Sequence, residues 1–469
     1  MSARYVLAID NGSQSTKVHI VDVAGVVVAS AQQPLRPYAY PEPGHVVHPD
    51  DDLWDSIAST CRAALRAFDG DPQDIAAVGL CTIRFCRALL DEHGALTEPV
   101  LSWMDVRVPR PHQSDPGVAY VTTSSGYITH RLTGQFNDTA ANYAGLWPID
   151  PRTMRWSTDE AAFVAAGMPR AQLFNLVDPG DLLGHITADA AAATGLPVGL
   201  PVFATANDKA VEALGAGVDE HTVLLSLGTY IAAMTMGRTW SEGPTHWANY
   251  ACLPHRYLHE SLGIRRGMWT VSWVRDLLFP TGFAPADGRS LEELLNAEAA
   301  MAPRGSGGLL TLLDWLAPTD APFRRGAFLG FDGTQGRSHL FRSVLEAIAI
   351  TMADHIEAME NALGNSYDAV VVTGGGAKSD LMMQIVADVL GRPSLRAAID
   401  DAAGLGAAIC AAVGVGLHAD WDTAIAAMVG PGTVFTPDAQ GVAEYLPVRA
   451  RYRALRAHAD PLFSALAEA

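Results

Sequence analysis

One sequence pattern occurs twice in this chain, once in each half, and it limits the fold more than any other feature. In the first half, residues 5–9 form an apolar run that ends at Asp10, and a turn rich in Gly and Ser leads into the alternating run 17–22. In the second half, residues 223–235 repeat this order of apolar run, Gly-Thr turn and apolar run. Such runs predict pairs of β-strands joined by tight turns. Two similar openings predict a duplicated domain, with the two copies facing a shared cleft.

Strands and helices alternate along the chain, so each copy is predicted to be an α/β domain. We place the boundary near residues 215–218, which gives domains 1–218 and 219–469. The remaining apolar spacing predicts two further strands and five helices, namely strands at 76–81 and 369–373 and helices at 51–68, 342–360, 381–390, 402–415 and 448–469.

Composition excludes several classes of protein. The net charge of −19 argues against a nucleic-acid partner, because binding to phosphates along a strand needs clustered Lys and Arg. The five cysteines form no C-x-x-C pair, which argues against a disulfide framework or a zinc site and favours a reducing cytoplasm. The apolar run near the first residues is too short to predict a signal peptide. No stretch reaches the roughly 18 apolar residues that are needed to span a membrane.

The turn after Asp10 has the residue types that bind phosphate. Glycine lets a phosphate approach the backbone, hydroxyls donate hydrogen bonds, and a lysine adds positive charge. The candidate nucleotide contacts in this turn are Gly12, Ser13, Gln14, Ser15 and Lys17. Asp10 is the candidate Mg²⁺ ligand, usually through water. A plain β-hairpin turn explains the same residues equally well.

The corresponding turn of the second half contains Gly228 and Thr229, and it is the second candidate phosphate turn. Alone, such a short sequence favours an ordinary hairpin turn. The two turns together could hold one polyphosphate from both sides.

A third glycine-rich segment lies between the predicted strand 369–373 and a predicted helix. Glycines at a strand-to-helix junction expose backbone amides beside the positive end of the helix, which suits the phosphates or adenosine of a nucleotide. The spacing fits neither a Walker A loop nor a dinucleotide fingerprint. The alternative is a close-packed turn with Ser379 as helix N-cap. The candidate contacts are Gly374, Gly375, Gly376, Ala377, Lys378 and Asp380.

Asp208 is the candidate catalytic residue. It follows the predicted strand 201–205 and precedes a predicted helix at 210–214. A carboxylate in that place can face a cleft and accept a hydroxyl proton, and Lys209 beside it would favour the ionised form. An N-capping aspartate with an exposed lysine is the competing interpretation.

Two segments of the first half mix donors, acceptors and aromatic rings, which suits recognition of a polyhydroxyl compound. Their candidate substrate contacts are Arg84, Phe85, Trp103 and Asp105, together with Asp208. The alternatives are a core position for Trp103 and a local ion pair between Asp105 and Arg107.

In this order the elements resemble the FGGY family of carbohydrate kinases, especially its xylulokinase-like members. Residues 326–346 are similar to the family's C-terminal signature, and residues 374–391 to its adenosine-binding segment. Asp208 stands where the family has its catalytic base. The resemblance implies two ribonuclease-H-like domains of the actin/hexokinase type around a central cleft, with ATP mainly on the second domain.

The resemblance also implies a reaction, namely ATP-dependent phosphorylation of a hydroxyl on a small sugar or polyol, with Mg²⁺ and with a ketopentose such as xylulose or ribulose as the expected acceptor. Only 23 residues separate Arg107 from Arg131, where the family has a longer segment that walls the sugar site. Phe85 follows Arg84 where glycerol kinases have Glu. A weakly catalytic sugar sensor and an actin-like ATPase are the alternatives, and a homodimer is left open.

Overall fold

The computed structural model describes residues 4–113, 115–143, 145–318 and 320–467. The first part of the chain forms these elements: β1 (Tyr5–Asn11), β2 (Ser15–Asp22), β3 (Val27–Pro34), α1 (Asp52–Ala67), β4 (Ile75–Thr82), β5 (Ala88–Leu90), β6 (Tyr120–Thr122), α2 (Ser124–Thr133), β7 (Asn137–Thr139), β8 (Ile149–Asp150), β9 (Arg155–Trp156), α3 (Glu160–Ala166), β10 (Asn175–Val177), β11 (Leu182–His185), α4 (Ala188–Thr194), β12 (Pro201–Ala204) and α5 (Asp208–Gly215).

The second part continues with β13 (Thr222–Leu227), β14 (Ile231–Gly237), β15 (His246–Tyr250), β16 (Tyr257–Ser261), α6 (Gly267–Leu278), α7 (Leu291–Met301), β17 (Leu310–Leu313), β18 (Gly326–Leu329), α8 (Arg337–Leu363), β19 (Ala369–Thr373), α9 (Asp380–Leu390), β20 (Ser394–Arg396), α10 (Ala402–Gly414), α11 (Trp421–Met428), β21 (Thr433–Phe435) and α12 (Ala439–Ala467).

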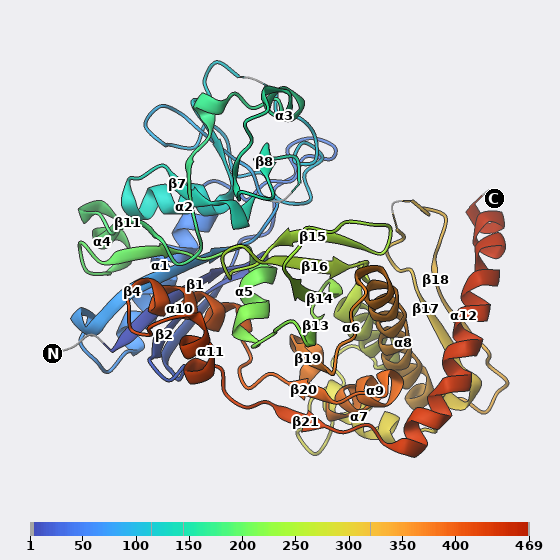
Figure 1. The fold of residues 1–469 in the computed structure, drawn as a ribbon. Helices are drawn as coiled ribbons and strands as arrows, with labels where there is room; N and C mark the ends of the chain where they lie inside the picture. Colours follow the sequence, from blue (N-terminus) through green and yellow to red (C-terminus); the bar gives the residue numbers. More distant parts are fainter. Residues whose placement is uncertain (1–3, 114, 144, 319, 468–469) are drawn as a thin grey trace.

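Two large β-sheets share a central order of five strands, β3-β2-β1-β4-β12 in the first and β16-β14-β13-β19-β20 in the second, and differ in their edge strands. The first has the strand order β11-β12-β4-β1-β2-β3, and the second has the order β15-β16-β14-β13-β19-β20-β21. In the first sheet β1 pairs antiparallel with β2 and parallel with β4. In the second sheet β13 pairs antiparallel with β14 and parallel with β19. The predicted duplication is therefore confirmed, and the fold is the predicted pair of ribonuclease-H-like α/β units. We call them the first and the second lobe (Figure 1).

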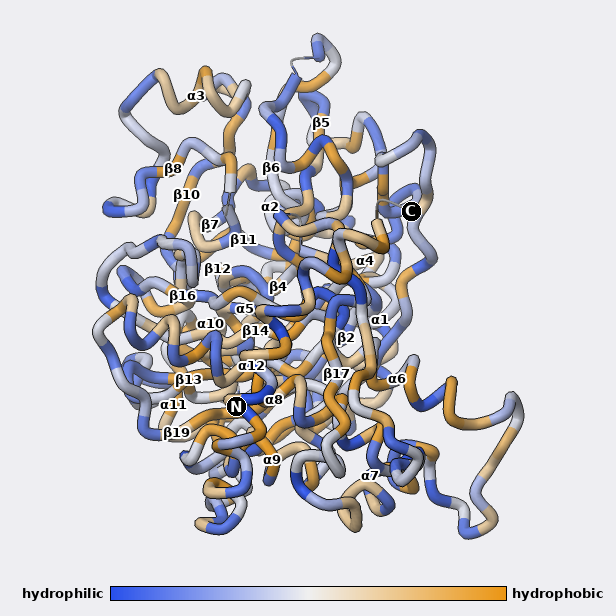
Figure 2. The backbone as a smooth tube through the Cα atoms, turned by 90° about the vertical axis from the view of Figure 1, so that its right-hand side faces the viewer, coloured by the Kyte–Doolittle hydropathy of each residue, from blue (hydrophilic) through white to orange (hydrophobic). Residues whose placement is uncertain are grey.

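Three cores hold these sheets and their helices in layers. Helices α1, α2 and α4 cover one face of the first sheet, and α6, α8 and α9 cover one face of the second sheet. A third core lies between the two sheets and contains side chains of α5 and α10. Figure 2 shows apolar stretches gathered around α8, α9 and β19. The two lobes therefore share one buried layer, which fixes the bottom of the cleft.

Helix α10 belongs to the second part of the chain but packs on the first lobe, against β1, β4 and α5 (Figure 1). Glycines make this close packing possible: a Cβ on Gly406 would collide with the backbone of Val211 in α5, and a Cβ on Gly215 with the backbone of Ala402 in α10. The composition of 402–415 predicts a tightly packed helix, and the structure shows where it packs. The division of the chain at residue 218 stays a proposal, because α10 follows that residue in sequence but packs on the lobe formed by the residues before it.

Most predicted elements are present with small shifts in their ends. The predicted strand 369–373 has the bounds of β19, and Ser379 is the N-cap of α9, accepting a hydrogen bond from the amide of Met382. The terminal helix begins at Ala439 rather than Val448 and contains Pro447 and Pro461. A proline removes one helical hydrogen bond and often marks a helix end, which is why the sequence predicts a shorter helix. No described helix is both long and apolar enough to cross a membrane.

Candidate active site

Asp208 occupies the first turn of α5, at the end of the connection from β12. The N-cap is Asn207, whose side chain accepts hydrogen bonds from the amides of Lys209 and Ala210 at 3.2 Å, so the interpretation of Asp208 as the cap is wrong. The Asp208 side chain is 30% exposed, and its Oδ1 lies 3.5 Å from Nε of Arg84. Burial raises the pKa of Asp208 above its ordinary value, although Arg84 and Lys209 oppose the shift. A carboxylate with raised pKa and partial access is a suitable proton acceptor.

Arg84 connects the two lobes. It follows β4 in the first lobe, and its Nη1 and Nη2 donate to the two carboxylate oxygens of Glu260 on β16 at 2.7 and 2.9 Å. Glu260 is 1% exposed and Arg84 10% exposed. A bidentate pair of hydrogen bonds between buried charged groups fixes the relative orientation of the two groups as well as their distance. No motif in the sequence pointed to Glu260. Its one signal there is that it is the single acidic residue of β16, a strand in which all five residues are buried.

Two aromatic rings flank the Arg84 guanidinium. Its central carbon lies 5.2 Å from the ring centre of Phe85 and 5.1 Å from that of Trp247 on β15. Phe85 has a φ of 61°, in the left-handed region that a bulky side chain rarely adopts. Strained backbone of this kind is concentrated at functional sites. The Arg84 loop is thus held by aromatic contacts from both lobes.

The other predicted substrate segment differs from expectation. Trp103 is 49% exposed, so it is no core residue and can contact a ligand. The Asp105 side chain is fully buried, and its oxygens accept hydrogen bonds from the amides of Val46 and Arg107 and from the Arg107 side chain at 2.8–2.9 Å. The prediction that Asp105 lines the sugar pocket is therefore wrong, and the local ion pair with Arg107 is the correct interpretation.

The first candidate phosphate turn, residues 12–14, joins β1 to β2 and holds Asp10 at the strand end. Lys17 Nζ lies 3.3 Å from Asp10 Oδ2 and 3.3 Å from Oδ1 of Asp401, the N-cap of α10. Burial raises the pKa of Asp10 to about 7, and the charge of Asp401 adds to the shift while Lys17 opposes it. Nearby negative charge that lacks a full counter-charge suits a cation. Sequence analysis missed Asp401, which is distant in sequence.

The residues around Asp10 fit Mg²⁺ bound in the manner usual for kinases. No cluster of three metal-ligating side chains occurs in the part of the chain that the structure describes. Mg²⁺ commonly takes only one or two carboxylates and fills its other positions with water and substrate phosphates. Asp10 would be such a ligand.

The two candidate nucleotide turns of the second lobe approach each other closely through their backbones. Gly374 has φ 80° and ψ −180°, a region essentially reserved for glycine, and a Cβ there would lie 2.5 Å from the carbonyl oxygen of Leu227. A Cβ on Gly376 would lie 2.8 Å from the Cβ of Leu227, whereas a Cβ on Gly375 would meet no described atom within 4 Å. Gly228 and Thr229 follow Leu227. The structure therefore brings together the second and third motifs, and Gly375 alone of these three glycines faces open space.

The end of the third motif reaches the surface. Lys378 Nζ pairs with Asp400 at 2.8 Å with both side chains well exposed, and Asp380 pairs with Arg396. In the first candidate phosphate turn, in the other lobe, Gln14 is exposed, and Gly12, Ser13 and Ser15 are half-buried.

A buried polar network joins α5 to the second lobe. Lys209 Nζ lies 2.8 Å from Oε2 of Glu212 and 2.9 Å from Oγ of Ser226, at the end of β13. Oε1 of Glu212 accepts hydrogen bonds from Ser226 at 2.8 Å and from Thr373, at the end of β19, at 2.6 Å. Sequence analysis expected an exposed Lys209 in its alternative interpretation; the lysine is instead 17% exposed and paired.

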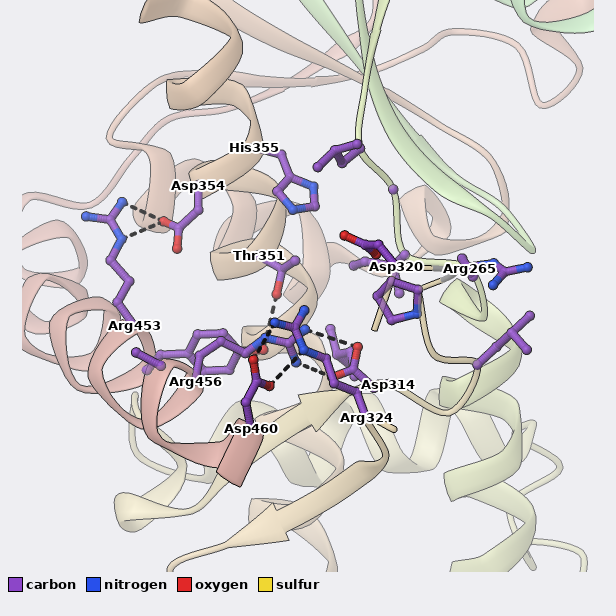
Figure 3. Close-up of a pocket in the computed structure, with 18 of the residues that line it drawn as sticks. Arg265, Asp314, Asp320, Arg324, Thr351, Asp354, His355, Arg453, Arg456 and Asp460 are labelled. Carbon is purple, nitrogen blue, oxygen red and sulfur yellow. Dashed lines mark hydrogen bonds and ion pairs between the residues drawn. The ribbon is translucent and has the colours of Figure 1, made fainter. Parts of the chain in front are cut away.

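A separate cavity of about 710 Å³ lies in the second lobe, bounded by α8, α12 and the segments 262–265, 313–318 and 320–324 (Figure 3). Three of its arginines pair with its aspartates, namely Arg324 with Asp460 at 2.7–2.8 Å, Arg456 with Asp314 and Arg453 with Asp354, while Arg265 donates to the carbonyl of Ala317. None of its described lining residues is a predicted site residue. Balanced charge gives the cavity no preference for an anion.

Comparison with known proteins identifies the family. The N-terminal domain of the FGGY family of carbohydrate kinases matches residues 5–114 and 110–215, and its C-terminal domain matches residues 223–415. The chain belongs to the FGGY family of carbohydrate kinases. It is therefore a sugar kinase, and ATP and a sugar are its substrates. The family resemblance drawn from the sequence motifs is confirmed.

Relatives in this family carry different substrate names. The chain is 46% identical over 442 residues to the uncharacterized sugar kinase YgcE of Escherichia coli (strain K12), covering 93% of this chain and 90% of that protein. It is 26% identical to a glycerol kinase of Dechloromonas aromatica (strain RCB) over 89% of this chain and 90% of the relative. The crystal structure of xylulose kinase from Rhodospirillum rubrum superimposes with a TM-score of 0.84 at 27% identity, covering 98% of this chain and 100% of that one.

Proposed function

We propose that this kinase transfers the γ-phosphoryl group of ATP to a hydroxyl of a ketopentose such as xylulose or ribulose. The observation that carries the proposal is the position of Asp208, a partly exposed carboxylate with raised pKa beside Arg84. The similarity to a xylulose kinase structure supports the ketopentose as acceptor. Five free, buried cysteines accord with a reaction in the reducing cytoplasm.

In the proposed reaction, Asp208 accepts the proton of the acceptor hydroxyl while the hydroxyl oxygen forms the new bond to the γ-phosphorus. The bond from that phosphorus to the bridging oxygen breaks, and ADP leaves with the electron pair. Little covalent chemistry is required of the protein, so positioning and charge neutralisation supply most of the rate. Arg84 lies beside Asp208 and stabilises its ionised form.

The nucleotide would lie against the turns that contain Gly12, Gly228 and Gly375, whose backbones can approach phosphate closely. Mg²⁺, with Asp10 as its protein ligand, would neutralise phosphate charge when bound. Lys17 lies beside Asp10 and adds a cation at the same place. Lys378 and Asp380 lie at the surface end of the third motif and would contact the part of the nucleotide that is nearest the protein surface.

We assign the acceptor pocket to Arg84, Phe85 and Trp103 of the first lobe, with Trp247 and Glu260 of the second. Trp103 is exposed, and Phe85 and Trp247 are half-buried; aromatic faces suit the C–H face of a sugar, and the paired charges suit its hydroxyls. The hairpin β15–β16 thereby contributes one wall of the proposed pocket, through the contacts of Glu260 and Trp247 with Arg84.

A screen of acceptors for ADP release tests the proposal, using ketopentoses, tetritols, glycerol and ketohexoses with ATP and Mg²⁺. We expect release to depend on a ketopentose. Asp208→Asn should reduce turnover by about 10²–10⁴-fold, the usual contribution of a general base, while ADP affinity measured by calorimetry stays unchanged.

Other outcomes point elsewhere. A variant that retains more than about a tenth of wild-type turnover would remove Asp208 from this role, given the size of a general-base effect. ATP hydrolysis without any acceptor would indicate an actin-like ATPase. Sugar binding without phosphoryl transfer would indicate a sensor.

A further inference from the structure

Lysine is rare in this chain, and its few positions are not scattered. Only three of the 32 Lys and Arg residues are lysines, namely Lys17, Lys209 and Lys378. Each lies within a segment already assigned to the nucleotide or to the catalytic base. Lysine presents a compact ammonium on a flexible stem, whereas arginine presents a planar fork, so the two are not interchangeable. Lys378 is at the surface, whereas the ammonium of Lys209 occupies a largely buried position that a compact cation suits.

Lys209 is the one of these three lysines that is not assigned to a nucleotide turn. Its ammonium is held between Glu212 and Ser226, and Glu212 in turn accepts hydrogen bonds from Ser226 and Thr373. Burial alone would raise the pKa of Glu212, but Lys209, Thr373 and Ser226 lower it below its ordinary value. The pair is therefore ionised inside the protein, where removing either partner leaves an uncompensated charge.

This network joins three functional segments. Lys209 and Glu212 lie on α5, which begins with Asp208. Ser226 stands two residues before Gly228 in the second nucleotide turn, and Thr373 precedes Gly374 in the third. The two turns also touch each other at Leu227. A shift of either turn would thus be transmitted through Glu212 to the helix that carries the catalytic base.

We propose that Lys209 and Glu212 form a lock between the helix bearing Asp208 and both nucleotide turns of the second lobe, and that Lys209 is a positioning residue for phosphoryl transfer. The role of Lys209 in transfer rests on the proposed function of Asp208. The lock itself is a property of the fold and can be tested without turnover.

The lock also sets the charge around the base. The charged groups that face Asp208 are Arg84 after β4, Glu260 on β16, Asp10 on β1, and Lys209 and Glu212 on α5 itself. Removing the positive charge of Lys209 raises the pKa of Asp208, and removing the negative charge of Glu212 lowers it. Two substitutions that break one ion pair therefore have opposite effects on the base, which loss of structure alone would not produce.

The first measurement is hydrogen exchange by mass spectrometry on the intact enzyme, comparing wild type with Lys209→Met and Glu212→Gln. Amides of residues 226–229 and 373–376 should exchange about threefold to tenfold faster in both variants, the effect of losing roughly one net hydrogen bond. Glu360→Gln is the matched control, because it breaks a similarly buried ion pair with Arg392 elsewhere in the second lobe. It should leave both turns unchanged.

The second measurement is the pH dependence of kcat/KM with the best acceptor. Activity requires ionised Asp208, so it falls as the pH drops through the pKa of that group. The acidic limb should move up by about one pH unit in Lys209→Met and down in Glu212→Gln, a shift at the low end of what a neighbouring charge causes.

The outcomes separate the claims. Unchanged exchange in both turns overturns the lock. Faster exchange overturns Lys209 as a positioning residue if the acidic limb of the pH profile stays in place in both variants. The same holds if the limb moves in the same direction in both. If wild-type enzyme phosphorylates no acceptor, the proposed function fails, and the exchange measurement still decides whether the lock exists.

Discussion

Asp105 and Asp208 both come shortly after an apolar run, yet their carboxylates differ in what is left free to react. Asp105 has hydrogen bonds to both oxygens and a fully buried side chain, and these bonds lower its pKa even though burial opposes the shift. Asp208 has fewer partners, partial exposure and a raised pKa. The first arrangement holds a loop together, and the second leaves an oxygen available for a proton.

Asp105→Asn should therefore reduce stability rather than change acceptor recognition. The amide cannot accept all of the hydrogen bonds that the carboxylate accepts, and the loss should be about 1–3 kcal/mol, typical of a buried hydrogen-bonded group. Calorimetric unfolding should show a lower melting temperature, while KM for the acceptor stays within twofold or so of wild type, since Asp105 does not face the cleft. A large rise in KM with unchanged stability would return Asp105 to the pocket.

His48 gives a pH dependence to stability. Its side chain is 1% exposed, and burial lowers its pKa from 6.5 to about 4 although Asp52 opposes the shift. The unfolded chain binds a proton at this residue more readily than the folded chain, so the residue's contribution to stability is full above pH 6.5 and is lost as the pH falls toward 4. Relative to a His48→Gln variant, wild type should lose about 2 kcal/mol between pH 7 and pH 5.

Calorimetry of both proteins at the two pH values measures this change. A constant difference between wild type and variant would show that His48 titrates with its ordinary pKa in the folded chain.

Residues near their motif partners can be predicted from sequence, and distant ones cannot. Asp208, Gly374 and Lys17 lie in segments whose local pattern already indicates a turn or a strand end. Glu260 lies 176 positions from Arg84, and no local pattern relates the two. Their pairing depends on how the two sheets face each other, which only the folded chain determines. Asp401, which contacts Lys17 through the return of α10 to the first lobe, was missed for the same reason.

In the third proposed nucleotide turn, the three adjacent glycines differ in what their backbone and surroundings require. Gly374 needs its backbone conformation, and Gly376 needs the absence of a side chain beside Leu227. Gly375 needs neither for folding, because the space beside it is open. The sequence alone treats the three glycines as equivalent, since only the backbone angles and contacts distinguish them.

Gly375→Val should therefore weaken nucleotide binding in a protein of normal stability. The added side chain would occupy the side from which a phosphate or adenosine approaches. Gly374→Ala should instead destabilise the protein by about 1–3 kcal/mol, the cost of forcing a non-glycine residue into this backbone region. Calorimetric ADP titration and thermal unfolding of both variants provide the comparison, and unchanged ADP affinity in folded Gly375→Val would remove this turn from the nucleotide site.

At the scale of the whole molecule, the two lobes meet at two levels. The buried layer formed by α5 and α10 joins the sheets at the bottom of the cleft. Above it, the hairpin β15–β16 of the second lobe reaches the first lobe through Glu260, Trp247 and Tyr257, whose hydroxyl donates to the carbonyl of Pro151 at 2.8 Å. The lower contact is apolar and extensive, and Tyr250, Tyr257 and Leu258 of the hairpin also pack in it, whereas the polar contacts from the hairpin to the first lobe are few. Motion between the lobes is therefore expected to separate the upper contacts first, which opens the acceptor site while the nucleotide turns of the second lobe stay intact.

Removing the polar upper contacts should open the cleft without any ligand. In the double variant Glu260→Gln/Tyr257→Phe, Arg84 loses its charged partner on the second lobe and the hairpin loses its hydrogen bond to Pro151, while the ring of residue 257 still packs in the apolar layer. Small-angle X-ray scattering should show a larger radius of gyration than wild type, and KM for the acceptor should rise while ADP affinity holds, because the proposed acceptor site spans both lobes and the proposed nucleotide site lies mainly on the second. The matched control is Asp314→Asn/Tyr452→Phe, which removes an acid and a tyrosine hydroxyl from contacts inside the second lobe. Control protein should scatter like wild type. Coinciding scattering curves for all three proteins would show that the hairpin contacts do not hold the lobes together, and closure would then have to come from the substrates themselves.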